Sequence, residues 1–232
     1  MTGQYRKKLP AGVARALRQE AGFGCAVCGH PYVEYHHIVP YQEEQHFRVK
    51  DMIAVCATHH GMLATQGQDR QYRIKETPRN IVNGEHRGML EYDQRNLVFR
   101  IGGNWYEDVP TILQFRQTPL ISCRLADDQA LVSINLYDRS GSVVIRVIDN
   151  EVAFRVDALW DFECTRRVAI VRSGPRDIAL KMDFSGPEAV VEGRLWAGTQ
   201  LLKLGKEETS IGGSLLRDCR ISNCKVGIQV DE

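Results

Sequence analysis

Hydrophobic and polar positions follow two different patterns along this chain, and the change falls near residue 92. In the first part, apolar residues recur at helical spacing over residues 10–21, which predicts a short amphipathic helix. Residues 32–39 are rich in β-branched and aromatic side chains, which is typical of a strand. A second short apolar run covers residues 51–56, and a helix is predicted to start near Thr58.

After residue 92 the apolar residues occur in short β-like runs separated by turn signals such as Gly-Gly and Asp-Asn. Many short strands at close spacing predict an all-β domain over residues 93–232, either sandwich-like or a short solenoid. The runs that carry this prediction are residues 97–101, 131–137, 143–148, 152–156, 168–171, 178–182, 189–195 and 225–230.

The stretch between the two parts, residues 66–92, is polar and contains Pro78, Asn83-Gly84 and Gly88 as breakers, which predicts a linker or arm. The expected organisation is therefore α+β. A small front domain over residues 1–65 is followed by this linker and by the β-rich domain.

Composition narrows the class of protein. The chain has 232 residues, of which 43% are hydrophobic and 25% charged, as in ordinary globular proteins. No apolar run is long enough for a transmembrane helix, and the basic start lacks the apolar segment of a secretory signal. We therefore expect a cytoplasmic protein with no membrane partner. Through residue 90 there are 12 Lys/Arg against 8 Asp/Glu, and all seven histidines lie at or before His86.

The 36 positions from Cys25 to His60 hold three cysteines and six histidines, and four of these histidines form the adjacent pairs His36-His37 and His59-His60. Cys25-x2-Cys28 and Cys56-x2-His59 are two ligand pairs with the spacing of a zinc knuckle, and Cys3His is a closed structural ligand set. A front domain with a small core gains much stability from such a metal. A redox dithiol or simple burial of Cys25 and Cys28 is the alternative, but neither explains the second pair.

The stretch His36-His37-Ile38-Val39-Pro40, followed by an apolar approach to Cys56 and by His60 directly after the fourth zinc ligand, resembles the HNH endonuclease family. This family is also called the ββα-metal or His-Me finger nucleases. The resemblance covers roughly residues 11–64. It implies a small zinc-stapled ββα-metal nuclease domain.

The resemblance implies a role for each surplus histidine. His37 would be the general base that deprotonates a water, and His36 and His60 would bind a catalytic divalent ion. Nitrogen ligands suit Mn²⁺ or Ni²⁺ at least as well as Mg²⁺. The family's middle Asn is here Asp51, which accepts hydrogen bonds and cannot donate them; it is expected to orient an imidazole N–H.

The function implied by this resemblance is metal-dependent hydrolysis of DNA phosphodiester bonds, in a setting such as restriction or anti-phage defence. RNA is an alternative substrate, and a non-catalytic zinc-stabilised binding or assembly module is the alternative function. Arg70, Arg73 and Lys75 are candidate contacts to the phosphate backbone. The β-rich domain is expected to serve recognition, regulation or homo-oligomerisation. His30, His46 and His86 are predicted to be surface residues.

Overall fold

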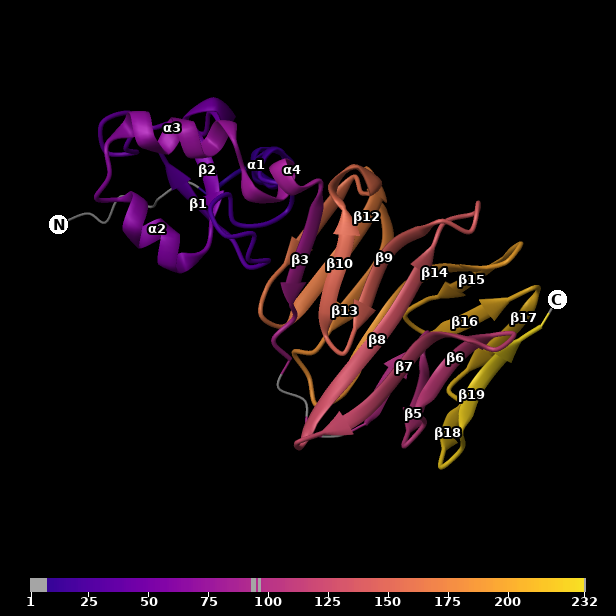
Figure 1. Cartoon of the computed structure of the whole chain (residues 1–232). Helices are drawn as coiled ribbons and strands as arrows, with labels where there is room; N and C mark the ends of the chain where they lie inside the picture. Colours follow the sequence, from indigo (N-terminus) through magenta and orange to yellow (C-terminus); the bar gives the residue numbers. More distant parts are fainter. Residues whose placement is uncertain (1–7, 93–94, 96, 232) are drawn as a thin grey trace.

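The computed structural model describes residues 8–92, 95 and 97–231, and it is a mixed, predominantly β structure (Figure 1). Its helices lie in the first part of the chain, apart from a short 3-10 turn, η2, in the β-rich part. The helical segments are α1 (Ala11–Glu20), η1 (Val49–Asp51), α2 (Ala57–Leu63), α3 (Gln68–Glu76), α4 (Arg79–Asn83) and η2 (Val156–Ala158).

The front part is built on a two-stranded antiparallel sheet of β1 (Glu34–His37) and β2 (Met52–Val55). His36 lies opposite Ile53 and His37 lies opposite Met52 in this ladder. All four residues of β2 are buried, because α1 and α2 pack beside it and enclose a small separate core. The helix predicted over residues 10–21 and the two predicted strands are confirmed, with shorter strand bounds.

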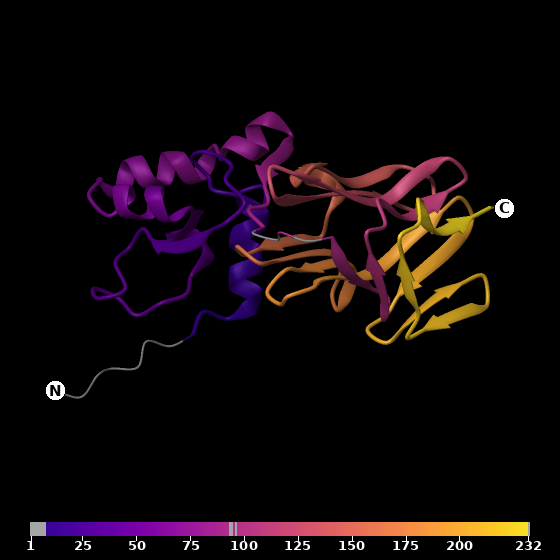
Figure 2. The ribbon, with the colours of Figure 1, turned by 90° about the horizontal axis from the view of Figure 1, so that it is seen from below.

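The β-rich part forms two sheets that lie in two layers, as Figure 2 shows from below. The first sheet has the order β19-β6-β7-β8-β9-β10-β3. Its strands are β3 (Glu85–Met89), β6 (Thr111–Phe115), β7 (Thr118–Ala126), β8 (Gln129–Tyr137), β9 (Val143–Ile148), β10 (Glu151–Arg155) and β19 (Val226–Val230).

The second sheet runs β11-β12-β13-β14-β15-β16-β17, and β4 adds to it alongside β14. Its strands are β4 (Val98–Ile101), β5 (Asn104–Glu107), β11 (Asp161–Cys164), β12 (Val168–Gly174), β13 (Asp177–Asp183), β14 (Ala189–Ala197), β15 (Gln200–Leu204), β16 (Glu208–Ile211), β17 (Ser214–Arg217) and β18 (Arg220–Ser222).

One apolar core fills the space between the two sheets. Strand β8 alternates exposed or half-buried with buried positions along its whole length, and Ile134 and Leu136 are buried in that core. From the second sheet, Leu180 and Val191 enter the same core. The architecture is therefore sandwich-like. One solenoid feature remains, because β18 and β19 pair in parallel with β5 and β6.

Residues 66–92 differ from the expected linker. They contain α3, α4 and β3, and β3 pairs antiparallel with β10 at the edge of the first sheet. The breakers shape these elements: Pro78 precedes α4 as its N-cap, and Gly84 ends α4 in the left-handed region at φ 72°. The polar sequence of β3 did not indicate a strand, because it lacks the β-branched and aromatic side chains that are common in strands. Backbone pairing with β10 holds this segment in the strand conformation.

The front part is held to the sandwich by α1 as well as by β3. Gln19 donates to the carbonyl of Trp160 at 2.6 Å, and the guanidinium of Arg15 lies 4.4 Å from the centre of the Trp160 ring. Arg18 forms a buried ion pair with Asp161 of β11. Helix α1, which precedes the first sheet in the chain, and strand β3, which joins that sheet, therefore both attach the front part to the β-rich part.

Within the described part of the chain, none of the helices has the length and apolar character needed to cross a membrane.

Candidate functional site

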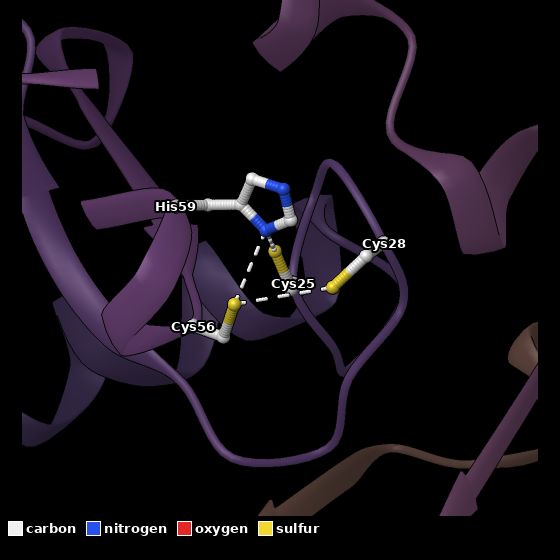
Figure 3. Close-up of side chains that lie close together, drawn as sticks. All are labelled: Cys25, Cys28, Cys56 and His59. Carbon is white, nitrogen blue, oxygen red and sulfur yellow. Dashed lines mark hydrogen bonds between the residues drawn. The ribbon is translucent and has the colours of Figure 1, made fainter. Parts of the chain in front are cut away.

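The first site is the Cys3His cluster, in which the four ligand atoms lie within 4.8 Å of one another (Figure 3). Cys25 and Cys28 come from the loop after α1, Cys56 is the N-cap of α2, and His59 lies in its first turns. Backbone hydrogen bonds close the Cys25–Cys28 loop: the amide of Gly29 donates to the carbonyl of Cys25 at 2.8 Å. Gly29 has a φ of 80°, which favours glycine at this turn.

The distances within the cluster fit one tetrahedral ion. Nδ1 of His59 lies 3.4 Å from Sγ of Cys25 and 3.2 Å from Sγ of Cys56, and the sulfurs of Cys28 and Cys56 are 3.9 Å apart. Ligands bound tetrahedrally to zinc at its usual bond lengths are about 3.6 Å apart for nitrogen and sulfur and about 3.8 Å for two sulfurs. The predicted ligands are therefore brought together, in a geometry consistent with structural zinc.

The pKa of a cysteine in the cluster also bears on cation binding. The residue Cys28 is exposed, but partial desolvation of its sulfur, together with the neighbouring sulfurs of Cys25 and Cys56, raises the pKa of Cys28 to about 12. A divalent ion among these sulfurs would reverse this effect, because its charge stabilises thiolates that otherwise repel one another.

The second site is a cavity of about 1030 Å³ bordered by the three surplus histidines, His36, His37 and His60. His36 and His37 end β1, and His60 lies in α2 directly after the zinc-cluster histidine. The rings of His36 and His60 lie edge to face, with their centres 5.0 Å apart. Two imidazoles that bind one metal through nitrogen have ring centres about 5 Å apart. The residue pair expected to hold a catalytic ion is thus brought together.

His36 is buried, and burial is the main cause that lowers its pKa, with smaller contributions from His60 and His37. Its Nε2 lies 2.9 Å from Oε1 of Gln71 on α3. The other histidine of the pair, His60, has the carboxylate of Glu34 at 3.6 Å from its Nδ1. Both rings therefore have a polar neighbour on the nitrogen that would not bind the ion, as in many metal sites.

His37 lies in an aromatic surrounding. Its ring centre is 5.2 Å from that of Tyr41, 5.1 Å from that of His46 and 6.1 Å from that of Phe47. Its Nε2 donates to the carbonyl of His46 at 3.1 Å, which places the lone pair of the neutral ring on Nδ1. The ring is oriented by the loop that follows β1, and it borders the same cavity as His36.

Asp51 differs from its expected contact with an imidazole. Its carboxylate accepts from Nε of Arg48 at 2.5 Å and from the hydroxyl of Tyr72 at 2.9 Å, and the Arg48 guanidinium lowers the pKa of Asp51. Its backbone carbonyl accepts from the amide of Ile38 at 2.9 Å. Asp51 thus fixes the end of the loop and the strand that carries the histidines.

The three candidate phosphate contacts lie on α3. Arg70 and Arg73 are exposed, close in sequence to Gln68 and Gln71, which border the cavity. Lys75 instead forms an ion pair with Glu20 of α1, so its charge is engaged within the front part.

Gln71 had no predicted role in this site, and two histidines predicted to lie at the surface, His46 and His86, are buried. Gln71 is only 4% exposed, and His46 is buried as well. Ring Nε2 of His46 donates to the carbonyl of Val39 at 3.0 Å, so it is part of the loop structure. His86 is fully buried beneath Phe154, with the two rings stacked at 4.7 Å. No local sequence signal marks a glutamine in a polar helix or a histidine in a polar loop as buried.

Comparison with known proteins gave no match among family models, curated proteins or solved structures.

Proposed function

We propose that this chain is a divalent-metal-dependent endonuclease of the HNH type that hydrolyses DNA phosphodiester bonds. The observation that carries the proposal is the convergence of His36, His37 and His60 on one cavity, outside the Cys3His cluster. A zinc module that only stabilises the fold needs none of these three side chains. The antiparallel pair β1-β2 followed by α2 supplies them in the order that the HNH resemblance implies.

The roles follow from the positions of the side chains. His36 and His60 would hold the ion, and their ring separation of 5.0 Å fits that task. When bound, a divalent ion stabilises the negative charge that develops on the phosphate and on the leaving oxygen. His37 would accept a proton from the attacking water. Its aromatic surroundings and the bond to the His46 carbonyl hold the ring in one orientation.

The cavity itself gives a reason for a metal requirement. None of the described residues that border it is Lys, Arg, Asp or Glu. The charge of a phosphate there must be balanced by the bound ion and by cations outside the cavity, for which exposed Arg70 and Arg73 are the candidates. A role in restriction or anti-phage defence is the setting that the family analogy favours.

The test is cleavage of supercoiled plasmid by the zinc-loaded full chain with Mg²⁺, Mn²⁺ or Ni²⁺, with an RNA substrate in parallel. We expect cleavage of DNA, with Mn²⁺ or Ni²⁺ at least as effective as Mg²⁺. His37→Ala should retain zinc and fold while losing about 10²–10⁴-fold in rate. An absence of cleavage with every metal would favour the non-catalytic module, and cleavage of RNA alone would make the chain an RNase.

A further inference from the structure

Gln71 occupies a position that no motif assigns, and its hydrogen bonds determine which way its amide points. Its Nε2 lies 3.0 Å from the carbonyl oxygen of Leu63 and 2.8 Å from that of Gln66. Both carbonyl oxygens can only accept, so the NH₂ group must face them. The amide oxygen is therefore the atom that faces His36.

The same logic assigns the proton on His36. Oε1 of Gln71 can only accept, and it lies 2.9 Å from Nε2 of His36. Nε2 must therefore carry the hydrogen, and the lone pair of the neutral ring lies on Nδ1. Both side chains are buried, so water competes little for this hydrogen bond.

We infer that Gln71 is a positioning residue that holds His36 as its Nε2–H tautomer and so reserves Nδ1 for a divalent metal ion. Ligating histidines generally donate their second ring N–H in this way, and loss of the partner weakens metal binding by about 10–100-fold. The metal part of this inference rests on the proposed function. The tautomer part stands on the hydrogen bonds alone.

One side chain also connects the elements that carry both proposed ligands. Leu63 is the last residue of α2, the helix of His60, and its carbonyl accepts from the amide of Gln66 at 3.0 Å as well as from Gln71. By donating to Leu63 and Gln66, Gln71 fixes the turn between α2 and α3. By accepting from His36, it fixes the ring at the end of β1. Gln71 thus sets the position of His60 relative to His36.

Two substitutions separate the tautomer role from the structural role. Gln71→Glu and Gln71→Met both lose the two donors to Leu63 and Gln66, but only Gln71→Met loses the acceptor for His36. If Gln71 served only the fold, Gln71→Glu should be at least as damaging as Gln71→Met, because its carboxylate faces the carbonyl oxygens of Leu63 and Gln66. Gln229→Met, on an exposed position of β19, is the matched control.

The measurement is long-range ¹H–¹⁵N NMR of the histidine rings in the zinc-loaded full chain at pH 8, followed by Mn²⁺ titration. We expect the Nε2–H tautomer of His36 in the wild type, in Gln71→Glu and in Gln229→Met, and a mixture of tautomers in Gln71→Met. Mn²⁺ affinity should fall about 10–100-fold in Gln71→Met and less in Gln71→Glu.

An Nδ1–H tautomer of His36 in the wild type, or an unchanged tautomer in Gln71→Met, would overturn the inference. A loss of Mn²⁺ affinity in Gln71→Glu as large as or larger than that in Gln71→Met would reduce Gln71 to a structural residue. If the wild type shows the Nε2–H tautomer but binds no Mn²⁺, the proposed metal site fails and the tautomer assignment stands.

Discussion

Arg18 of α1 and Asp161 of β11 form a buried ion pair with two hydrogen bonds, Nε to Oδ1 at 2.9 Å and Nη2 to Oδ2 at 2.6 Å. The remaining nitrogen of the guanidinium, Nη1, donates to the hydroxyl of Tyr35 at 2.7 Å. Tyr35 directly precedes His36 on β1. A single arginine therefore connects the β-sandwich to the strand that carries the proposed catalytic histidines.

Removal of Asp161 should destabilise the protein strongly, because the buried charge of Arg18 then has only the exposed carboxylate of Glu163, 3.8 Å away, to balance it. We expect Asp161→Ala to lower the free energy of unfolding by about 3–5 kcal/mol. Asp157→Ala is the control, since Asp157 forms the same two-point pair with Arg155 on the surface. It should change stability little, because exposed pairs contribute little. Equal effects in urea unfolding would contradict the structural role of the buried pair.

The zinc assignment predicts that Cys28→Ser loses the metal and the fold of the front part. Cysteine sulfurs must bind as thiolates, and the free energy of zinc binding stabilises small domains of this kind directly. Elemental analysis should give about one zinc ion per chain for the wild type and near zero for the variant. Cys219→Ser, which changes a half-buried cysteine of the β-rich part, should retain the metal. Equal zinc content in the wild type and Cys28→Ser would refute the ligand set.

His86 should make the protein less stable as the pH falls. Burial, with a smaller contribution from His30, lowers the pKa of His86 from 6.5 to about 4. The unfolded chain therefore binds a proton between pH 6.5 and 4 that the folded chain excludes. Stability is fully present above about pH 6.5 and is lost toward pH 4, by about 3 kcal/mol.

His86→Phe is the variant that isolates this effect, because it keeps an aromatic ring against Phe154 and removes the titrating group. Its stability at pH 8 should be lower than that of the wild type, since Asn80 loses its bond to the ring, 3.0 Å long in the wild type. The difference between the two proteins should narrow as the pH falls. Parallel stability curves between pH 8 and 4 would contradict the account, and effects of the zinc site cancel in the comparison.

Local patterns in the sequence predicted the local elements of this structure, but they did not predict its long-range contacts. Spacing predicted α1 and the proximity of the Cys3His side chains correctly, because both depend on residues at short, regular spacing in the chain. The pairing of β3 with β10 joins residues more than sixty positions apart and leaves no periodic trace in a polar segment. A linker was therefore expected where the structure has a sheet edge.

In the candidate site, too, the residues of local motifs were predicted, and the residues placed by contacts between elements were not. The motif from His36 to Pro40 and the position after His59 predicted that three histidines belong to one site, and the structure brings those three to one cavity. Gln71 could not be recognised, because its role depends on the turn between α2 and α3 and not on the spacing of its own helix. Asp51 was expected at an imidazole, but Arg48 and Tyr72 are close enough to take both of its oxygens.

We propose that this chain has two metal sites that use adjacent histidines, His59 for structural zinc and His60 for a catalytic ion. The most direct measurement is a crystal structure of the zinc-loaded full chain soaked in Mn²⁺, with anomalous data collected at the zinc and manganese edges. We expect zinc among Cys25, Cys28, Cys56 and His59, and a separate manganese ion bound by His36 and His60. Manganese absent from the cavity, or one ion shared by His59 and His60, would contradict this proposal.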